Sequence, residues 1–237
     1  MTDGPRVAVI GTGKMGRAVM ELARERGWPV VAALGAADTT HGEGLTRERL
    51  AGAQVALEFT TAAAAPSNAR ACARAGCPVV IGTTGWDAER PQVEEDVLRA
   101  GGAMLWSPNF AIGVHLFWQV AELAARLATP RRGFDAHIVE THHAAKRDAP
   151  SGTARELARL AGEARGREIP TTSVRTGSVP GTHELLLDAP FEQIRVVHEA
   201  RDRRLFADGA LAAARWLVGR QGVFTMRDFL LSEGMPA

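Results

Sequence analysis

The segment "ETHHAAKRDAPSGTA" at 140–154 gathers side chains that could bind and protonate an anionic substrate. His142 and His143 are adjacent, Lys146 follows them, and Pro-Ser-Gly-Thr comes near the end of the run. An imidazole donates a proton near neutral pH, and a nearby lysine adds positive charge. The first residues of a helix offer backbone N–H groups to an anion. These residue types predict a site for a substrate that carries carboxylates.

A plain structural interpretation of the same segment is that the two histidines end a strand and the lysine is solvated. We favour the functional interpretation, because a histidine pair, a lysine and the start of a helix coincide there. Glu140 either orients a histidine or simply ends the strand, and Ser151 or Thr153 could cap the helix that follows. Five other histidines are expected to be packed or surface residues, with His183 as the one exception to watch: His41, His115, His137, His183 and His198.

The stretch "GTGKMG" at 11–16 has the Gly-x-Gly-x-x-Gly spacing of a dinucleotide-binding turn. Gly11 permits a tight turn, Gly13 lets a pyrophosphate approach the backbone, and Gly16 lets the helix pack closely on the strand. The pattern is informative because it follows an apolar run and opens a helix. It therefore predicts a loop that places phosphates on the helix N-terminus.

The end of the second predicted strand lacks the acidic residue that usually holds the ribose 2′-hydroxyl of the cofactor. Gly35 stands where that acid is expected, and Asp38 follows three residues later. No arginine lies in this short loop to accept the 2′-phosphate of NADPH. The residues therefore leave the choice between NADH and NADPH open.

The first half of the chain alternates between apolar runs and stretches of helical composition. This alternation is typical of βαβ units and a parallel sheet. The expected fold is therefore an α/β, Rossmann-type doubly wound parallel sheet. Its strands are predicted near residues 6–10, 29–34, 54–59, 78–82 and 103–106.

The pattern changes after residue 110 to an α+β order with a mixed, largely antiparallel sheet. A helix is predicted over 112–128, with Leu116, Val120, Leu123 and Leu127 on one stripe. Further elements are a strand over 134–143, a helix over 151–166, strands over 183–189 and 192–201, and a helix that ends near Gly219 before a final short turn. We expect residues 1–110 and 208–237 to form a dinucleotide-binding domain. Residues 111–207 are expected to form a substrate-binding and oligomerisation domain.

The composition excludes several other classes of protein. The 237 residues are 46% hydrophobic and 23% charged with a formal net charge of +1, so no nucleic-acid or membrane partner is indicated. No apolar run approaches the roughly 18 residues of a membrane span, and no basic-then-apolar leader opens the chain. Cys72 and Cys77 predict buried thiols rather than a disulfide or metal site. We expect a cytoplasmic protein without a resident metal ion.

The chain as a whole resembles the dihydrodipicolinate reductase family, whose members are also called 4-hydroxy-tetrahydrodipicolinate reductases. Residues 140–154 resemble the family signature E-x-H-H-x-x-K-x-D-x-P-S-G-T-A. Further segments resemble its nucleotide, hinge and C-terminal pieces: "VAVIGTGKMGRAV", "EFTTAAAAPSNARAC", "VIGTTGW", "SPNFAIGVHLFWQV", "SVPGTHE" and "LFADGALAAARWLVGRQGVFTMRDFL".

The resemblance implies reduction of 4-hydroxy-tetrahydrodipicolinate, a dicarboxylate, to tetrahydrodipicolinate by hydride transfer from NADH or NADPH. The reaction belongs to diaminopimelate and lysine biosynthesis, and the family is usually tetrameric. His142 resembles the general acid and Lys146 its catalytic partner. The implied substrate-binding residues are His143, Lys146, Ser151, Gly152 and Thr153. The implied cofactor-binding residues are Gly11, Thr12, Gly13, Lys14, Met15, Gly16, Gly35, Phe59, Thr60, Gly82, Thr83, Thr84, Ser107, Asn109 and Phe110.

Two other classes of function remain open from the residues alone. An aspartate or semialdehyde dehydrogenase would share the two-domain plan, but the latter needs a nucleophilic cysteine at the domain border. Cys72 and Cys77 lie instead in or just after a helix of the nucleotide domain. A redox sensor that binds a dinucleotide and a partner protein has no use for the histidine pair and lysine. Binding of pyridine-2,6-dicarboxylate would favour the reductase, because neither alternative predicts it.

Overall fold

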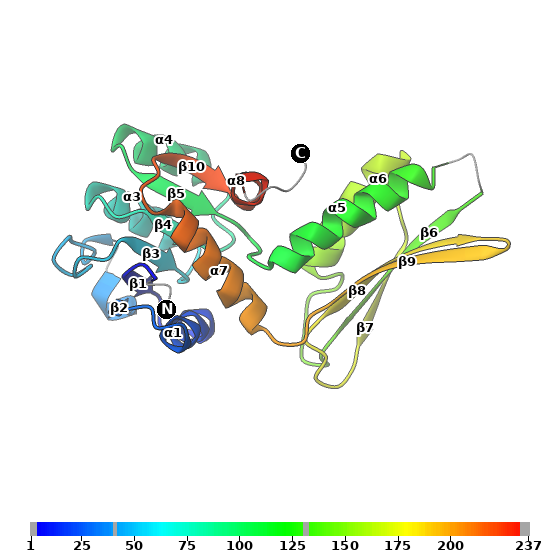
Figure 1. Cartoon of the computed structure of the whole chain (residues 1–237), viewed down its shortest axis with the longest axis horizontal. Helices are drawn as coiled ribbons and strands as arrows, with labels where there is room; N and C mark the ends of the chain where they lie inside the picture. Colours follow the sequence, from blue (N-terminus) through cyan, green and yellow to red (C-terminus); the bar gives the residue numbers. More distant parts are fainter. Residues whose placement is uncertain (1–3, 40–41, 130–132, 233–237) are drawn as a thin grey trace. The chain divides into compact units, whose positions relative to one another are not determined.

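The chain divides into two compact units, each with its own sheet (Figure 1). The first unit comprises Met1–Ala111 together with Arg204–Ala237, and the second comprises Ile112–Arg203. The computed structural model describes residues 4–39, 42–129 and 133–232, so His41 lies outside the described residues. Within those residues, every helix is too short or too polar to cross a bilayer.

The first unit is built on a six-stranded parallel sheet with the order β10-β5-β4-β3-β1-β2. The central strands are buried along their whole length, as expected for a parallel sheet with helices on both faces. The Rossmann-type prediction is therefore confirmed. The strands are β1 (Val7–Ile10), β2 (Val30–Leu34), β3 (Val55–Glu58), β4 (Val79–Ile81), β5 (Ala103–Trp106) and β10 (Gly222–Thr225).

Helices cover both faces of this sheet. On one face α1 (Lys14–Glu25) packs against α7 (Arg204–Leu217), and on the other α3 (Ala65–Arg74) packs against α4 (Arg90–Arg99). The chain runs from β1 outward to β2 and then returns to β3 on the far side of β1. Open α/β sheets bind ligands where the strand order reverses in this way, beyond the carboxyl ends of the strands.

The second unit is a four-stranded sheet with the order β7-β6-β8-β9, next to two helices. Strand β6 runs parallel to β7 and antiparallel to β8, and β8 runs antiparallel to β9. This sheet is mixed and largely antiparallel, as predicted. Its elements are α5 (Ile112–Leu127), β6 (Asp135–His142), α6 (Gly152–Arg165), β7 (Thr171–Arg175), β8 (Thr182–Ala189) and β9 (Glu192–Glu199).

Two parts of the chain differ from the prediction. Strand β7 was not predicted, because its sequence "TTSVR" is mostly polar and only half-buried. The final short turn is wrong as well. Residues 222–225 form strand β10, which pairs in parallel with β5, and residues 226–232 form helix α8 (Met226–Ser232). The sequence of β10, "GVFT", begins with glycine, ends with threonine and is only partly buried, so it lacks the continuous apolar run that marks the other parallel strands.

The buried face of α5 also differs from what the leucine stripe suggests. Leu116, Val120, Leu123 and Leu127 are all exposed, with Leu127 at 75%. The buried positions of the helix are instead small or aromatic: Val114, Phe117, Ala121 and Ala125. Close packing of α5 on α6 and the sheet explains this choice, since alanines let helices approach one another. The largest apolar residues of a helix therefore do not always mark its buried face.

Candidate active site

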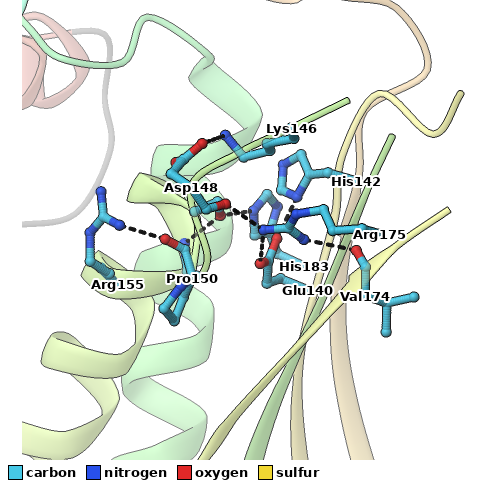
Figure 2. Close-up of polar contacts among 11 residues, drawn as sticks. Glu140, His142, Lys146, Asp148, Pro150, Arg155, Val174, Arg175 and His183 are labelled. Atoms are coloured by element: carbon cyan, nitrogen blue, oxygen red, sulfur yellow. Dashed lines mark hydrogen bonds and ion pairs between the residues drawn. The ribbon is translucent and has the colours of Figure 1, made fainter. Parts of the chain in front are cut away.

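His142 ends strand β6 and is held there by a buried carboxylate. Alternate residues of β6 are buried, so Glu140 and His142 share the helix-covered face of the sheet. Glu140 is completely buried, and its carboxylate accepts a hydrogen bond from His142 Nδ1. Arg175, the neighbour of His142 on strand β7, donates to the other carboxylate oxygen at 2.6 Å (Figure 2). Glu140 therefore orients the histidine, which is one of its two predicted roles.

These contacts fix which nitrogen of His142 is left for chemistry. Burial raises the pKa of Glu140, but hydrogen bonds from Arg175, Ser173 and His142 bring it down to about 2. An ionised carboxylate only accepts, so His142 Nδ1 carries a proton and Nε2 is the nitrogen that can react. Burial lowers the pKa of His142, and the adjacent Glu140 charge opposes that effect. The negative charge therefore supports the protonated form of the ring.

A glycine lies directly beside this reacting nitrogen. Gly181 precedes strand β8 with φ of +155°, and a Cβ at this position would lie 2.9 Å from His142 Nε2. The same Cβ would lie 3.7 Å from His183 Cε1. Any side chain at position 181 would therefore press on the imidazole edge that carries Nε2.

His183 is a second buried histidine in the cluster. It lies opposite Glu140 across β6 and β8, and its ring centroid is 5.0 Å from that of His142. Burial, and then the neighbouring His142, lower the pKa of His183 to about 3, so this ring is neutral near pH 7. Donor atoms of the three residues lie within 4.8 Å of one another, a spacing that could also hold a metal ion. Both Glu140 oxygens already have cationic or N–H partners, so we interpret the cluster as an acid–base site.

The start of helix α6 adjoins this cluster through Ser151. The Ser151 hydroxyl accepts a hydrogen bond from Ala154 N at 3.2 Å, which makes it the N-cap of the helix. The same oxygen lies 3.0 Å from His183 Nε2. Gly152 and Thr153 form the first turn of α6, from which helices bind anions. The predicted cap is confirmed at Ser151.

Lys146 lies in the loop between β6 and α6. Its Nζ pairs with Asp148 Oδ1 at 2.8 Å, and its backbone N–H donates to the His143 carbonyl. The carbonyl oxygen of Asp148 in turn accepts from Arg175 at 2.7 Å, so the loop is tied to the partner of Glu140 (Figure 2). Of the predicted catalytic and substrate-binding residues, His142 and Ser151 are linked through His183, and Lys146 is linked through Asp148 to Arg175. His143, Gly152 and Thr153 lie beside them in the same segment.

The glycine loop of the first unit fits a dinucleotide. Gly11 has φ of +98°, and a Cβ there would overlap the Phe59 carbonyl, while a Cβ on Gly16 would overlap the Gly11 carbonyl. Gly13 is the N-cap of α1, makes no side-chain cap and would meet no described atom within 4 Å of an added Cβ. The helix N-terminus is therefore open to an anion at the position where the motif predicts a pyrophosphate.

The other predicted cofactor residues follow the carboxyl ends of successive parallel strands. The Thr60 backbone N–H donates to Thr83 Oγ1 at 2.8 Å, and the rings of Phe59 and Phe110 meet edge to face at 6.3 Å. A Cβ on Gly82 would overlap the Phe59 ring. The remaining positions follow the same strands: Thr12 lies in the loop after β1, Gly35 after β2, Thr84 after β4, and Ser107 and Asn109 after β5. Lys14 and Met15 are the first two residues of α1.

Sequence reasoning missed Glu58, the last residue of β3, which lies beneath these loops. Its side chain is fully buried and accepts hydrogen bonds from Thr60 Oγ1 and from Asn68 Nδ2, the latter at 3.1 Å. Burial raises the pKa of this carboxyl group. The only signal in the sequence is an acidic residue that ends an otherwise apolar run, "VALE". Glu58 therefore helps to fix the Thr60 turn.

An open glycine loop on a Rossmann-type sheet, together with a histidine–carboxylate site on a second sheet, defines a nicotinamide-dependent oxidoreductase. Comparisons with known proteins identify the family. A family model described as dihydrodipicolinate reductase, N-terminus, matches residues 5–110, and one described as dihydrodipicolinate reductase, C-terminus, matches residues 113–230.

Named relatives and a solved structure agree with these matches. The 4-hydroxy-tetrahydrodipicolinate reductases of Thiobacillus denitrificans and Archaeoglobus fulgidus are each 37% identical to the chain. Both alignments cover 95% of this chain, with 98% and 99% of the two relatives. The structure of a dipicolinate-bound dihydrodipicolinate reductase from Paenisporosarcina sp. TG-14 has a TM-score of 0.77 at 25% identity, over 94% of this chain and 97% of that one. The chain therefore belongs to the dihydrodipicolinate reductase family.

Proposed function

We propose that His142 is the general acid in the reduction of 4-hydroxy-tetrahydrodipicolinate to tetrahydrodipicolinate. Membership of the family assigns this reaction of diaminopimelate and lysine biosynthesis, with NADH or NADPH as reductant, to the chain. The observation that carries the role of His142 is the buried Arg175–Glu140–His142 chain of contacts. It directs Nδ1 to a carboxylate and leaves Nε2 as the proton donor.

The first unit supplies the cofactor site in this proposal. The bound reduced nicotinamide supplies the hydride that is added to C4 of the substrate ring. Gly13 and the α1 N-terminus hold the pyrophosphate, and the loops after β3, β4 and β5 hold the nicotinamide half. The support is the open helix N-terminus and the placement of these loops at the carboxyl ends of neighbouring strands.

Proton transfer in this proposal belongs to the second unit. Addition of hydride to a conjugated imine leaves an electron-rich enamine, which a proton must neutralise. His142 Nε2 delivers that proton while Glu140 stays ionised and steadies the ring. Since burial lowers the pKa of His142, the negative charge of a bound dicarboxylate favours protonation of the ring when substrate is present.

The cationic groups around His142 bind the two substrate carboxylates. Lys146 exchanges its ion pair with Asp148 for one carboxylate, and the first turn of α6 at Gly152 and Thr153 holds the other through backbone N–H groups. His143, half-buried beside them, adds a further polar contact. The small-molecule partner of the site is therefore a dicarboxylate.

We further infer a cytoplasmic homotetramer, assembled through the sheet of the second unit. The support is the face of this sheet that points away from its helices, where Val174 and Val197 remain exposed by 36% and 51%. The two-domain division into a dinucleotide-binding part and a substrate-binding, oligomerisation part belongs to the same proposal.

A His142→Gln variant tests the acid assignment. It should bind NADH or NADPH as the unchanged protein does and lose turnover by about 10²–10⁴-fold, the usual contribution of a general acid. His137→Gln is the matched control, because His137 lies on the same strand, faces the other side of the sheet and contacts Thr172. Nearly intact turnover of the His142 variant contradicts the assignment.

Binding of pyridine-2,6-dicarboxylate tests the substrate class independently of turnover. Calorimetry should detect this planar dicarboxylate competing with substrate, and a Lys146→Ala variant should weaken its binding. A protein that binds the dinucleotide but not this dicarboxylate would point to one of the dehydrogenase alternatives.

A further inference from the structure

The end of β2 does carry an acidic group, although the residue there is glycine. Asp38 lies on the short helix α2 (Ala36–Thr39), and its side chain turns back to the strand. Its Oδ2 accepts a hydrogen bond from the Gly35 backbone N–H at 2.8 Å. A Cβ on Gly35 would lie 3.6 Å from that oxygen and 3.4 Å from Thr12 Oγ1. The carboxylate therefore lies where β2 ends, near the glycine loop.

Arg49 holds this carboxylate in place. Its Nη2 pairs with Asp38 Oδ1 at 2.5 Å, and its Nη1 donates to the Asp38 carbonyl at 3.1 Å. A Cβ on Gly44 would overlap that carbonyl and lie 3.0 Å from Arg49 Nη1, so a glycine is needed for the close approach. Both terminal nitrogens of the guanidinium are thus engaged by Asp38 itself. Gly35 and Arg49, with the room that Gly44 leaves, thus hold the Asp38 carboxylate in one position.

Both side chains remain within reach of a ligand. The side chains of Asp38 and Arg49 are 38% and 45% exposed. Dinucleotide folds hold the ribose 2′-hydroxyl with an acid at the end of the second strand, and an arginine accommodates a 2′-phosphate. Here the arginine is already paired with Asp38, so it is not free to bind a 2′-phosphate.

We propose that Asp38, positioned by Gly35 and Arg49, makes this reductase prefer NADH over NADPH. The residue at the end of β2 is Gly35, which has no carboxylate to bind the ribose, and Asp38 of α2 supplies one instead. The carboxylate accepts a hydrogen bond from a ribose hydroxyl, and it also occupies the arginine that could otherwise pair with a 2′-phosphate, so it favours NADH in both respects. The inference rests on the proposed function, since it names the cofactor preferred at that same site.

Direct binding to the full-length protein without substrate tests the preference. Nicotinamide fluorescence would be titrated with NADH and with NADPH in separate experiments. The unchanged protein should bind NADH at least about tenfold more tightly, which is a discrimination of about 1.4 kcal/mol. Asp38→Ala should weaken the binding of NADH and strengthen the binding of NADPH, because Arg49 is released. The ratio of NADH affinity to NADPH affinity should fall to about one or below.

Two further variants and one control complete the experiment. Asp38→Asn keeps a side-chain oxygen for Gly35 but removes the charge, so its ratio should lie between those of the unchanged protein and Asp38→Ala. Adding Arg49→Ala to Asp38→Ala should remove the gain in NADPH binding. Asp208→Ala is the matched control, because Asp208 forms a similarly exposed ion pair with Arg26 at 2.6 Å in the same unit and should leave the ratio unchanged.

The outcomes separate this inference from the proposed function. Equal binding of both cofactors by the unchanged protein, or an equal effect of Asp38→Ala on both, overturns the role of Asp38 and leaves the proposed reaction intact. A clear NADH preference that Asp38→Ala abolishes supports the inference even if the substrate proves to be different. Thermal unfolding of each variant checks that it is folded, and Asp38→Asn supplies the test if Asp38→Ala is not.

Discussion

At the scale of single residues, His142 is controlled by opposing influences on its pKa. Burial lowers the pKa of the ring, and the ionised Glu140 beside it works in the other direction. Arg175 keeps Glu140 ionised, so this arginine acts on His142 through the carboxylate. The pKa of His142 is therefore set by its burial together with the Arg175–Glu140 contacts.

A Glu140→Gln variant should shift the pH dependence of turnover. In the proposed mechanism turnover needs protonated His142, so it is lost as the pH rises through the pKa of that ring. Removing the negative charge lowers this pKa further, so the loss of turnover should begin at a lower pH than in the unchanged protein. Steady-state kcat measured against pH gives the shift directly.

Glu184→Gln is the matched control for that profile. Glu184 lies on β8, where it forms an ion pair with Arg195 on β9 and faces the other side of the sheet. Its replacement should leave the pH profile unchanged. If Glu140→Gln lowered turnover equally at every pH, Glu140 would have only a structural role.

A Gly181→Ala variant should reduce turnover without changing dinucleotide binding. The added Cβ would lie 2.9 Å from His142 Nε2, and a misplacement of about 1 Å in a reacting group costs about 10²-fold in rate. Gly177→Ala is the control, because Gly177 also has positive φ, +50°, but its added Cβ meets no described atom within 4 Å. Equal losses in the two variants would mean that backbone strain, and not pressure on His142, is responsible.

The residues of the site differ in how far the sequence could predict them. His142 and Lys146 belong to one contiguous motif, so their neighbourhood is visible in sequence. Arg175 and His183 reach His142 only through the pairing of β6 with β7 and β8, and strand register is not written in any local pattern. Asp38 lies three residues beyond the position at which the motif expects an acid, and only the turn of α2 brings its side chain back to Gly35.

At the scale of elements, the N-terminus of α6 carries a helix cap and, in the proposed function, also a substrate contact. Ser151→Ala removes the N-cap and should lower the free energy of unfolding by about 1 kcal/mol. It should also weaken the binding of pyridine-2,6-dicarboxylate, because the first turn of α6 loses its hydrogen bond to His183. Chemical denaturation and calorimetry measure the two effects.

Ser67→Ala provides the comparison for the Ser151 variant. Ser67 lies within α3, where its hydroxyl donates to the Ala64 carbonyl at 2.9 Å and caps no N-terminus. This variant should change stability less and leave dicarboxylate binding unaltered. Identical behaviour of the two serine variants would show that the α6 cap has no special connection to the site.

The predicted strands of the parallel sheet have continuous apolar sequences, and the two strands that the prediction missed do not. Strands β1 and β3 to β5 are buried on both faces, so their sequences are continuously apolar apart from the terminal Glu58. Strand β7 is polar, and β10 is a short edge strand that depends on pairing with β5. Both strands are completed by pairing with β6 and β5, which no apolar run in the sequence announces.

At the scale of the whole molecule, the buried histidine and carboxylate make stability depend on pH. The folded pKa of His183 is about 3, below its ordinary 6.5, so its contribution is complete above pH 6.5 and is lost as the pH falls toward 3. The contribution of Glu140 is present above pH 4.5 and is lost toward pH 2. The thermal midpoint should therefore fall steadily from pH 6.5 downward.

Replacing His183 checks the origin of that fall. In His183→Asn the decline between pH 6.5 and pH 4.5 should become shallower, because the largest histidine shift is gone while Glu140 is not yet protonated. Differential scanning calorimetry across this range measures the slope. A midpoint that stays constant or rises as the unchanged protein is acidified contradicts the assignment of a buried neutral His183.

The fold class of the whole molecule could be predicted, because the two halves of the chain carry different periodicities. Alternating apolar runs and helices define the parallel sheet, and a mixed strand and helix order defines the second sheet. The identity of the buried face of α5 could not be predicted, since it depends on how closely α6 and the sheet approach that helix.

The most direct test of the reaction is oxidation of reduced nicotinamide in a coupled assay. A dihydrodipicolinate synthase would generate the substrate in place from pyruvate and aspartate semialdehyde, with NADH and NADPH supplied in separate reactions. We expect oxidation that depends on the synthase, is faster with NADH at low cofactor concentration, and is nearly abolished in His142→Gln. Folded protein that binds dinucleotide but oxidises neither cofactor would show that this histidine–lysine site acts on a different substrate.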